Sequence, residues 1–502
     1  MIDVNRQISR LIHYGLQKNL LGKDDIFYTA NRLLFLLKAS DFEWTPIDEC
    51  LPYPAEILSS LCDYAVQTGA LQEDHLDGRD RFDTELMNCL MPRPRDIVAH
   101  FYDEYKKSPE RASSYYYNLS CSSNYIRMDR IEKDQKWETA TQYGDMIITV
   151  NLSKPEKDPK AIAAAKLAPQ SGYPKCALCR ENEGFTGSAN QAPRATHRLI
   201  PFSLCEEDYL MQYSPYVYYN EHCIILNREH KPMKVDRPCF DKLLSFLDFL
   251  PHYFIGSNAD LPIVGGSILS HDHFQSGCFD FPMAKAGIRQ PVSFAGYEDI
   301  QAGIVHWPMS VLRLNGKDKS RIAELSDRIL SAWRGYSDEE ADILAFTGDT
   351  PHNTITPIAR RRAEGYEMDL VLRNNRTTDE HPLGIFHPHA EYHHIKRENI
   401  GLIEVMGMAI LPPRLLQEMD VMEEALRHPE KAGSLLESEA MRKHAQWYED
   451  LKADECTKEN ITKAIRDSIG IIFKDILSNA GVYKDTPAGM AAFLKFCSSV
   501  TG

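Results

Sequence analysis

The side chains best able to do chemistry lie in one short segment, where His271, His273 and Gln275 alternate with other residues. In an extended strand, side chains two positions apart point to the same face, about 6.6 Å from one another along the chain. Polar groups at this density make a poor core. The segment is therefore interpreted as a reactive or metal-binding surface.

Three interpretations are open for this segment: core histidines satisfied by neighbours, a structural metal site, or a nucleophile with a phosphate-orienting partner. The third is favoured. A neutral imidazole, whose ordinary pKa is about 6.5, is a competent nucleophile if its other nitrogen donates to a carbonyl. The Gln275 amide can bind phosphate oxygens, and the preceding Gly265-Gly266 pair would let backbone approach a phosphate closely.

A second chemical signal is the pair Cys176-x-x-Cys179, which supplies half of a tetrahedral zinc site. No second such pair follows, so the other ligands would have to be histidines. The first candidates are His230 and His271, and the alternatives are His222 and His197. The competing interpretation is two thiols at a buried turn.

A second histidine-rich segment follows more than a hundred residues later. If it forms a strand, one face carries His387, His389, Glu391 and His393. Three imidazoles and a carboxylate suit a borderline divalent metal. A polar rim around a substrate pocket is an equally open interpretation.

Arg127 and Arg130 form a basic pair close to the predicted strands. Guanidinium groups can hold phosphate through two hydrogen bonds at once. The alternative is that each is an arginine solvated at the surface.

The bulk properties limit the function classes. The chain has 502 residues and a formal net charge of −15, which argues against nucleic acid as the main partner but leaves room for a local phosphate-binding pocket. No apolar run is long enough to span a bilayer, and no export signal is evident. The 12 cysteines show no disulfide framework, so reduced thiols in a cytoplasmic protein are expected.

The sequence predicts four regions that together position these residues. Residues 1–115 and 416–502 show helical periodicity, and 116–290 and 291–415 are two strand-rich halves that look like a divergent duplication. The first half has strand-like runs at 146–150, 216–219, 222–226 and 261–264, and a helix at 240–255. The second has strands at 352–356, 369–372 and 387–394. The expected class is α+β.

Four segments together resemble one family, the galactose-1-phosphate uridylyltransferases in their longer, type 2 bacterial form: 176–184, 214–222, 256–275 and 386–396. The resemblance covers most of the chain. It implies membership of the histidine-triad superfamily, and hence duplicated antiparallel half-barrels with flanking helices, plus helical N- and C-terminal segments. It also implies exchange of a uridylyl group between UDP-glucose and galactose 1-phosphate, in a homodimer that uses no NTP or organic cofactor.

The resemblance assigns roles to residues. His273 falls on the nucleophile, Gln275 on the residue that orients the phosphoryl oxygens, and Asn258 near a nucleotide contact. The substrate-binding set further includes Arg127, Arg130, Gly265, Gly266 and Ser267. Zinc would be held by Cys176, Cys179, His230 and His271, and a second divalent metal would involve His387 and His389.

The chain departs from the shorter form at Asp272 and Phe274, where that form has proline and glycine. Two other functions are therefore weighed. One is a dinucleoside-polyphosphate phosphorylase or hydrolase of the same superfamily. The other is a non-catalytic nucleotide-binding protein, against which the presence of both His273 and Gln275 speaks.

Overall fold

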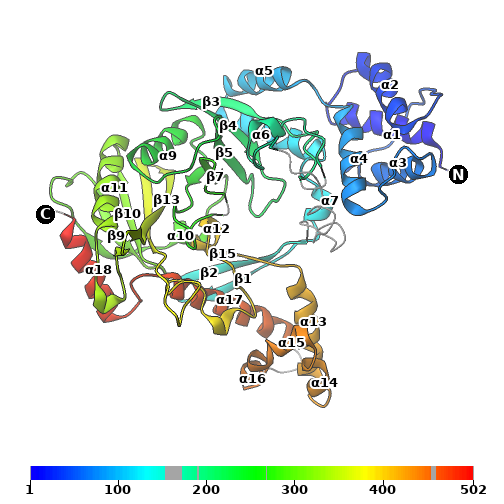
Figure 1. Cartoon of the computed structure of the whole chain (residues 1–502). Coiled ribbons are helices and arrows are strands. Elements are labelled where there is room, and N and C mark those ends of the chain that lie inside the picture. The colour runs from blue at the N-terminus through cyan, green and yellow to red at the C-terminus, as the bar shows by residue number, and fades with distance from the viewer. Residues whose placement is uncertain are drawn as a thin grey trace. The chain divides into compact units, whose positions relative to one another are not determined.

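A computed structural model describes residues 2–152, 172–188, 191–266, 268–363, 365–453 and 460–500. The chain forms two compact units, the first made of residues 1–133, 153–217 and 221–231, and the second of 134–152, 218–220 and 232–502. Each unit is described by itself below, with the elements labelled as in Figure 1.

The first unit begins with helices, as the periodicity of residues 1–115 predicts. They are α1 (Val4–Gln17), η1 (Lys23–Asp25), α2 (Ile26–Leu37), α3 (Ala55–Gln67), α4 (Leu76–Asn88), α5 (Pro94–Tyr105), α6 (Pro109–Ser122) and α7 (Met128–Ile131). Helix α1 buries Ile8, Leu11 and Ile12, which the helical repeat brings to one face. The Asp3 side chain caps it by accepting from the Arg6 amide at 3.0 Å.

Three antiparallel strands complete this unit together with η2 (Arg180–Asn182): β3 (Ile200–Leu204), β4 (Glu207–Tyr213) and β5 (Cys223–Asn227). The turn between β3 and β4 places Cys205 and Glu206 at φ 48° and 66°, as a tight hairpin requires. Strand β5 confirms the prediction at 222–226. The strand predicted at 216–219 is wrong, because Pro215 lacks an N–H to donate and the chain turns there.

The second unit contains a small sheet of order β1-β2-β15, from β1 (Gln135–Thr141), β2 (Gly144–Val150) and β15 (Met408–Leu411). Strand β2 confirms the prediction at 146–150. Helix α17 (Ile461–Ala480) packs closely on this sheet, since a Cβ on Gly470 would lie 2.3 Å from the Thr139 hydroxyl. This contact belongs to a large apolar core that also takes in the helices after β15.

The larger sheet of the second unit carries strands in the order β7-β6-β13-β14-β10-β9-β8, all antiparallel. They are β6 (Phe254–Gly256), β7 (His273–Gly277), β8 (Ile288–Val292), β9 (Gln301–Val305), β10 (Val311–Gly316), β13 (Asn353–Arg362) and β14 (Gly365–Asn374). Strands β13 and β14 confirm the predictions at 352–356 and 369–372. Helix α9 (Arg237–Phe249), predicted at 240–255, packs against β13 together with α11 (Lys319–Arg334) (Figure 1).

Shorter elements connect these layers: α10 (Pro282–Lys285), η3 (Glu339–Ala341), the hairpin β11 (Phe346–Thr347) and β12 (Thr350–Pro351), η4 (Ala390–Tyr392) and α12 (Leu402–Val405). The C-terminal helices, also predicted, are α13 (Arg414–Arg427), α14 (Ala432–Leu436), α15 (Glu439–Arg442), α16 (Ala445–Ala453), α17 and α18 (Pro487–Ser499). No helix within the described ranges has the length and apolarity needed to cross a bilayer.

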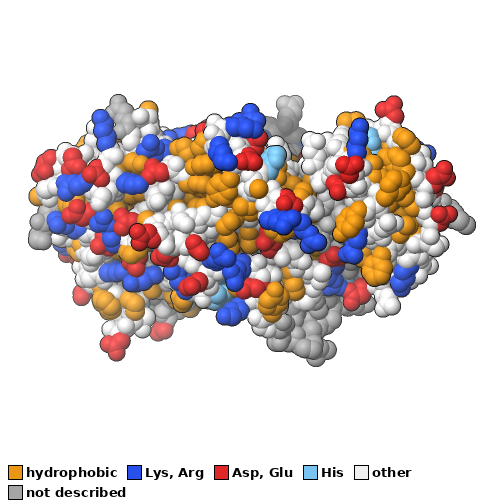
Figure 2. Space-filling model, turned by 90° about the horizontal axis from the view of Figure 1, so that it is seen from above, with side chains coloured by type: hydrophobic (Ala, Val, Ile, Leu, Met, Phe, Trp, Pro, Cys, Tyr) orange, Lys and Arg blue, Asp and Glu red, His pale blue; other side chains and the backbone are white. Residues whose placement is uncertain are grey.

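The α+β class, with antiparallel sheets and flanking helices, is confirmed, while two predicted strands are wrong. Residues 261–264 form a turn in which Ile263 has φ 74°. Residues 387–394 form a bend followed by η4, because Pro388 interrupts backbone pairing between the two histidines. The four-part division of the chain stays a prediction. Figure 2 shows basic and acidic side chains interspersed over one face, with no single-sign field.

A buried ionic network ties the large sheet together. Asp369 on β14 is fully buried and accepts from Arg313 on β10 at 2.7 and 2.9 Å and from Arg360 on β13 at 2.8 Å. Burial alone would raise the pKa of Asp369, but the two guanidinium groups outweigh it and hold that pKa below its ordinary value. The carboxylate therefore stays charged in the sheet.

Replacing Asp369 with asparagine should destabilise the second unit by about 3 kcal/mol, because it leaves Glu367 as the one carboxylate that balances the two buried guanidinium groups of Arg313 and Arg360. Urea unfolding followed by circular dichroism measures the change. The matched control is Asp299→Asn, which breaks an exposed pair with Arg321 and should change stability little. Equal effects of the two substitutions would contradict the role of the network.

Candidate active site

The nucleophile segment opens a strand. His273 is the first residue of β7, and Gln275 pairs with Gly256 of β6. His273 and Gln275 therefore share one face, as predicted. His271 precedes the strand, so the prediction that all three side chains lie on one strand is wrong for His271. Strand β6, which pairs with β7, ends at Gly256. The hydrogen bonds between the two strands therefore do not extend as far as His271.

The orientation of the His273 ring is set by one hydrogen bond. Its Nδ1 lies 2.7 Å from the main-chain oxygen of His271. A carbonyl oxygen only accepts, so Nδ1 must carry the hydrogen, and Nε2 keeps its lone pair. Burial lowers the pKa of His273 below its ordinary value, although this hydrogen bond and Asp272 act in the opposite direction. The ring is therefore a neutral imidazole at neutral pH.

Asn258 and the glycine pair pack beside this strand. The Asn258 side-chain oxygen accepts from the Leu402 amide at 3.0 Å. A Cβ on Gly266 would lie 2.7 Å from the Asn258 side-chain nitrogen, and one on Gly265 would lie 2.5 Å from the Ala259 carbonyl oxygen. Glycine is thus required at both positions by the chain's own packing. Ser267, the next predicted residue, lies outside the described residues.

The Cys-x-x-Cys motif and its first candidate histidine come together in the first unit. The two sulfurs of Cys176 and Cys179 are 3.5 Å apart, and Cys179 Sγ lies 3.1 Å from His230 Nδ1. The Asn182 amide donates to the carbonyl oxygens of both cysteines and so holds the turn. This is a donor set that could hold a metal ion. His271 belongs to the second unit.

The two alternative zinc ligands, His222 and His197, make other contacts. His222 Nδ1 donates to the Tyr216 carbonyl oxygen at 2.9 Å. The His197 ring packs against Tyr125 with ring centroids 4.9 Å apart. Within the described residues, neither belongs to a set of three or more possible metal ligands.

The second histidine segment lies in the loop after β14. Buried His387 has Nε2 3.2 Å from the Asn399 side-chain oxygen, and burial lowers its pKa. His389 stacks on His381 with centroids 4.5 Å apart and donates to the Ile385 carbonyl oxygen. Across the described ranges, no three possible metal ligands gather around either ring.

Arg127 and Arg130 are both held by carboxylates of α4. Arg127 makes bonds of 2.6 and 2.8 Å to Asp83, and Arg130 makes bonds of 2.5 and 2.8 Å to Asp80. Neither guanidinium group is simply solvated, since their side chains are 18% and 24% exposed. A phosphate would have to compete with these carboxylates.

Comparison with known proteins assigns the chain to a family. The family model "Galactose-1-phosphate uridyl transferase, N-terminal domain" matches residues 20–232, and its C-terminal counterpart matches residues 247–448. The chain belongs to the galactose-1-phosphate uridylyltransferase family. The galactose-1-phosphate uridylyltransferase of Clostridium acetobutylicum is 51% identical over 495 residues, covering 98% of this chain and 99% of the relative.

Other members of this family are similarly close. The galactose-1-phosphate uridylyltransferase of Bacillus subtilis is 48% identical over 501 residues, covering 99% of this chain and 97% of the relative. Among solved structures, yeast Ap4A phosphorylase Apa2 shows 12% identity and a TM-score of 0.30, covering 59% of this chain and 89% of its own. A likeness at that level carries no argument about fold or function.

One residue near the site escaped the sequence reasoning. Arg373 on β14 is buried and donates to the Ile400 carbonyl oxygen at 2.9 Å, two residues from the Leu402 amide that binds Asn258. Arg373 and Asn258 therefore both hold the segment that contains Ile400 and Leu402. The available signal was an arginine directly after the apolar run 370–372.

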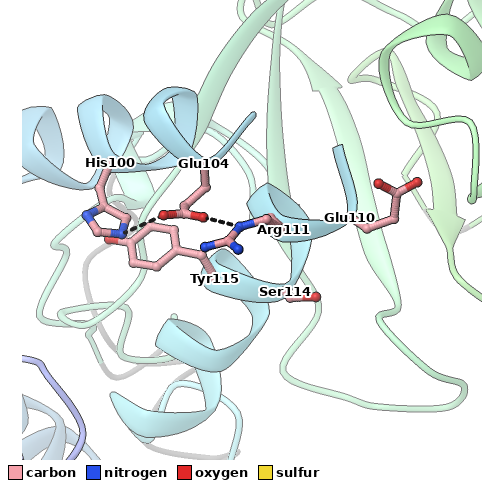
Figure 3. A pocket seen from close by; sticks show the side chains of 6 residues that line it. All are labelled: His100, Glu104, Glu110, Arg111, Ser114 and Tyr115. Atoms are coloured by element: carbon pink, nitrogen blue, oxygen red, sulfur yellow. Dashed lines mark hydrogen bonds and ion pairs between the residues drawn. The ribbon is translucent and has the colours of Figure 1, made fainter. Parts of the chain in front are cut away.

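A surface hollow in the first unit lies apart from these residues. It is lined by His100, Glu104, Glu110, Arg111, Ser114 and Tyr115 of α5 and α6 (Figure 3). Glu104 accepts from Arg111 at 2.7 Å and has His100 4.0 Å away, so its charge is compensated within the hollow. None of the predicted site residues lines it.

The state of the His273 ring is directly testable. Nitrogen NMR at about pH 6.5, where an ordinary histidine is half protonated, should show a neutral ring with hydrogen on Nδ1, because burial disfavours the charged form. His273→Gln assigns the signal by its disappearance. Finding an imidazolium, or hydrogen on Nε2, would contradict the orientation described.

Proposed function

We propose that this chain exchanges UMP between UDP-glucose and galactose 1-phosphate through a covalent uridylyl-histidine at His273. The activity follows the relatives, which are named galactose-1-phosphate uridylyltransferase and match nearly the full chain. The observation that carries the role of His273 is its Nδ1 bond to the His271 carbonyl oxygen. That bond leaves Nε2 as the free nucleophile in a neutral ring.

Each half-reaction makes one bond to phosphorus and breaks another. The Nε2 lone pair attacks the α-phosphorus of UDP-glucose, and the bond to the bridging oxygen breaks, releasing glucose 1-phosphate with that electron pair. A phosphate oxygen of galactose 1-phosphate then attacks the same phosphorus, and the N–P bond breaks to give UDP-galactose. The imidazole attacks and leaves as a neutral group, and the sugar phosphates that leave and attack are already anions, so no NTP and no strong base are needed.

The surrounding residues have positioning roles in this proposal. The His271 carbonyl oxygen stabilises the positive charge that the ring gains when Nε2 bonds to phosphorus. Gln275, on the same face, orients the non-bridging oxygens. Asn258, with Gly265 and Gly266, borders the substrate. The proposal does not rely on Arg127 and Arg130, because Asp83 and Asp80 occupy them.

Incubation with UDP-glucose alone should give a uridylyl adduct by intact-mass spectrometry, absent in His273→Ala. Labelled glucose 1-phosphate should also enter UDP-glucose without any galactose 1-phosphate. Gln275→Ala should form the adduct about 10²–10³-fold more slowly, since a donor to the developing charge is lost. His75→Gln, an exposed position on the first unit, is the control. Cleavage of a diadenosine polyphosphate without this exchange would support the alternative enzyme instead.

We further propose that Cys176, Cys179, His230 and His271 hold a zinc ion. The support is the donor chemistry, two thiols and two imidazoles, and the close approach of Cys179 to His230. Zinc there would be structural, restraining the Cys-x-x-Cys turn and His271, whose carbonyl oxygen orients His273. The second metal at His387 and His389 is not part of the proposal.

Purified protein should carry one tightly held zinc at this site by mass spectrometry of its metals. Cys179→Ser should lose that zinc and lower the thermal midpoint, because a structural site contributes directly to folding. Cys205→Ser, at an exposed hairpin turn, is the control. Retention of the zinc in Cys179→Ser would refute the ligand set.

The setting of the enzyme is also a proposal. We infer a cytoplasmic homodimer that acts on sugar phosphates and binds no nucleic acid. None of the described cysteines forms a disulfide, as expected in a reducing compartment, and the dimer rests on the family resemblance. Light scattering after size-exclusion chromatography measures the oligomeric state directly.

A further inference from the structure

A lysine lies buried on helix α9, which packs against β6 and β13 of the large sheet. The apolar stripe of this helix includes Cys239, Leu243 and Phe246, all of them buried. Lys242 falls on the same stripe by the helical repeat and is buried as well. A lysine is rarely buried unless an acidic group pairs with it. Lys242 was not among the predicted site residues.

The structure places the carboxylate of Asp272 against this lysine. Lys242 Nζ lies 3.9 Å from Asp272 Oδ2, and each of the two side chains is 9% exposed. Asp236 and Asp260 also lie near this part of α9, but other cations pair with both. A buried charge is stable only when it is paired, so the ion pair restrains both Lys242 and Asp272.

Asp272 shares a peptide group with the atom that orients the nucleophile. The His271 carbonyl oxygen, 2.7 Å from His273 Nδ1, belongs to the peptide that joins His271 to Asp272. This group is planar, so the oxygen and the Asp272 N–H turn together. If the peptide flipped, an N–H donor would replace the oxygen beside Nδ1. Nδ1 would then accept, and the hydrogen of the neutral ring would move to Nε2.

We propose that Lys242 is a positioning residue for the nucleophile, because its ion pair with Asp272 holds the peptide oxygen toward His273 Nδ1. This inference rests on the proposed uridylyl transfer at His273. Lys242 acts through the backbone. Helix α9 anchors Asp272, Asp272 fixes the peptide, and the peptide selects Nε2 as the nitrogen with the free lone pair.

The same peptide is restrained on its other side by His271. This residue is buried, and it belongs to the four residues proposed to hold zinc. Lys242 and Asp272 are not members of that donor set. Removing the ion pair should therefore release the peptide without releasing the metal, and the zinc content distinguishes the two restraints.

The tautomer of His273 reports the position of the peptide. Nitrogen NMR should show hydrogen on Nδ1 in the wild type, whereas Lys242→Met and Asp272→Asn should each place part of it on Nε2. A loss of stability alone would not move the hydrogen between the two nitrogens. The control is Asp241→Asn, which breaks a partly exposed pair with Arg237 on the same helix and should leave the tautomer unchanged. The wild-type tautomer in both test variants would overturn the proposal.

The rate of adduct formation at saturating UDP-glucose gives a second readout. Lys242→Met and Asp272→Asn should each slow it by about 10²-fold, because a small misplacement of a reacting group has an effect of that order. Both should keep the zinc content of the wild type. The double variant should be no slower than the slower single variant, since both substitutions remove the same ion pair. Multiplying rate losses, or loss of zinc in either single variant, would overturn the proposal.

The double variant also covers a single substitution that prevents folding. It carries neither charge of the pair, so it leaves no member of the pair buried alone and should fold. The wild-type tautomer and rate in the folded double variant would refute the role of Lys242. A wild-type protein that forms no adduct would refute the proposed function. The tautomer comparison needs no substrate, so it still decides whether the pair holds the peptide.

Discussion

The hydrogen bond from His273 Nδ1 to the His271 carbonyl oxygen is the constraint on which the proposed chemistry depends. A histidine can attack phosphorus only with an unprotonated nitrogen, and this bond selects that nitrogen as Nε2. The bond is possible because the chain enters β7 at His273 and leaves the His271 carbonyl oxygen just outside the ladder. Burial adds to it by keeping the ring neutral.

The rest of the large sheet keeps this bond in place. Strand β7 pairs with the short β6, and β6 in turn pairs with β13 and is followed by Asn258. Asn258 reaches the Leu402 amide, and Arg373 reaches the neighbouring Ile400 carbonyl oxygen. Beyond them, Asp369 holds three strands through two arginines. A buried polar network of this kind specifies one arrangement, because any slip would leave charged groups unpaired.

The histidines of the chain differ in the hydrogen bonds that their ring nitrogens make. His273 keeps a free nitrogen beside a strand, whereas His387 and His389 have their nitrogens engaged by an amide and a carbonyl oxygen. The rings of His394 and His444 pack edge to face with centroids 5.3 Å apart, and each ring donates or accepts through one nitrogen only. The difference lies in which neighbouring atom each ring nitrogen contacts.

The amino-acid sequence by itself determined the helices α9 and α17, the strands β13 and β14, and the reactive motif, because apolar periodicity and close spacing are local properties. It misplaced strands at 216–219, 261–264 and 387–394, where a proline or a turn overrides strand propensity. Only the tertiary structure decided which residues pair across long stretches of chain. Arg127 pairs with Asp83, 44 residues away, and Cys179 contacts His230, 51 residues away. Such pairings depend on how distant segments meet, and no local pattern encodes that.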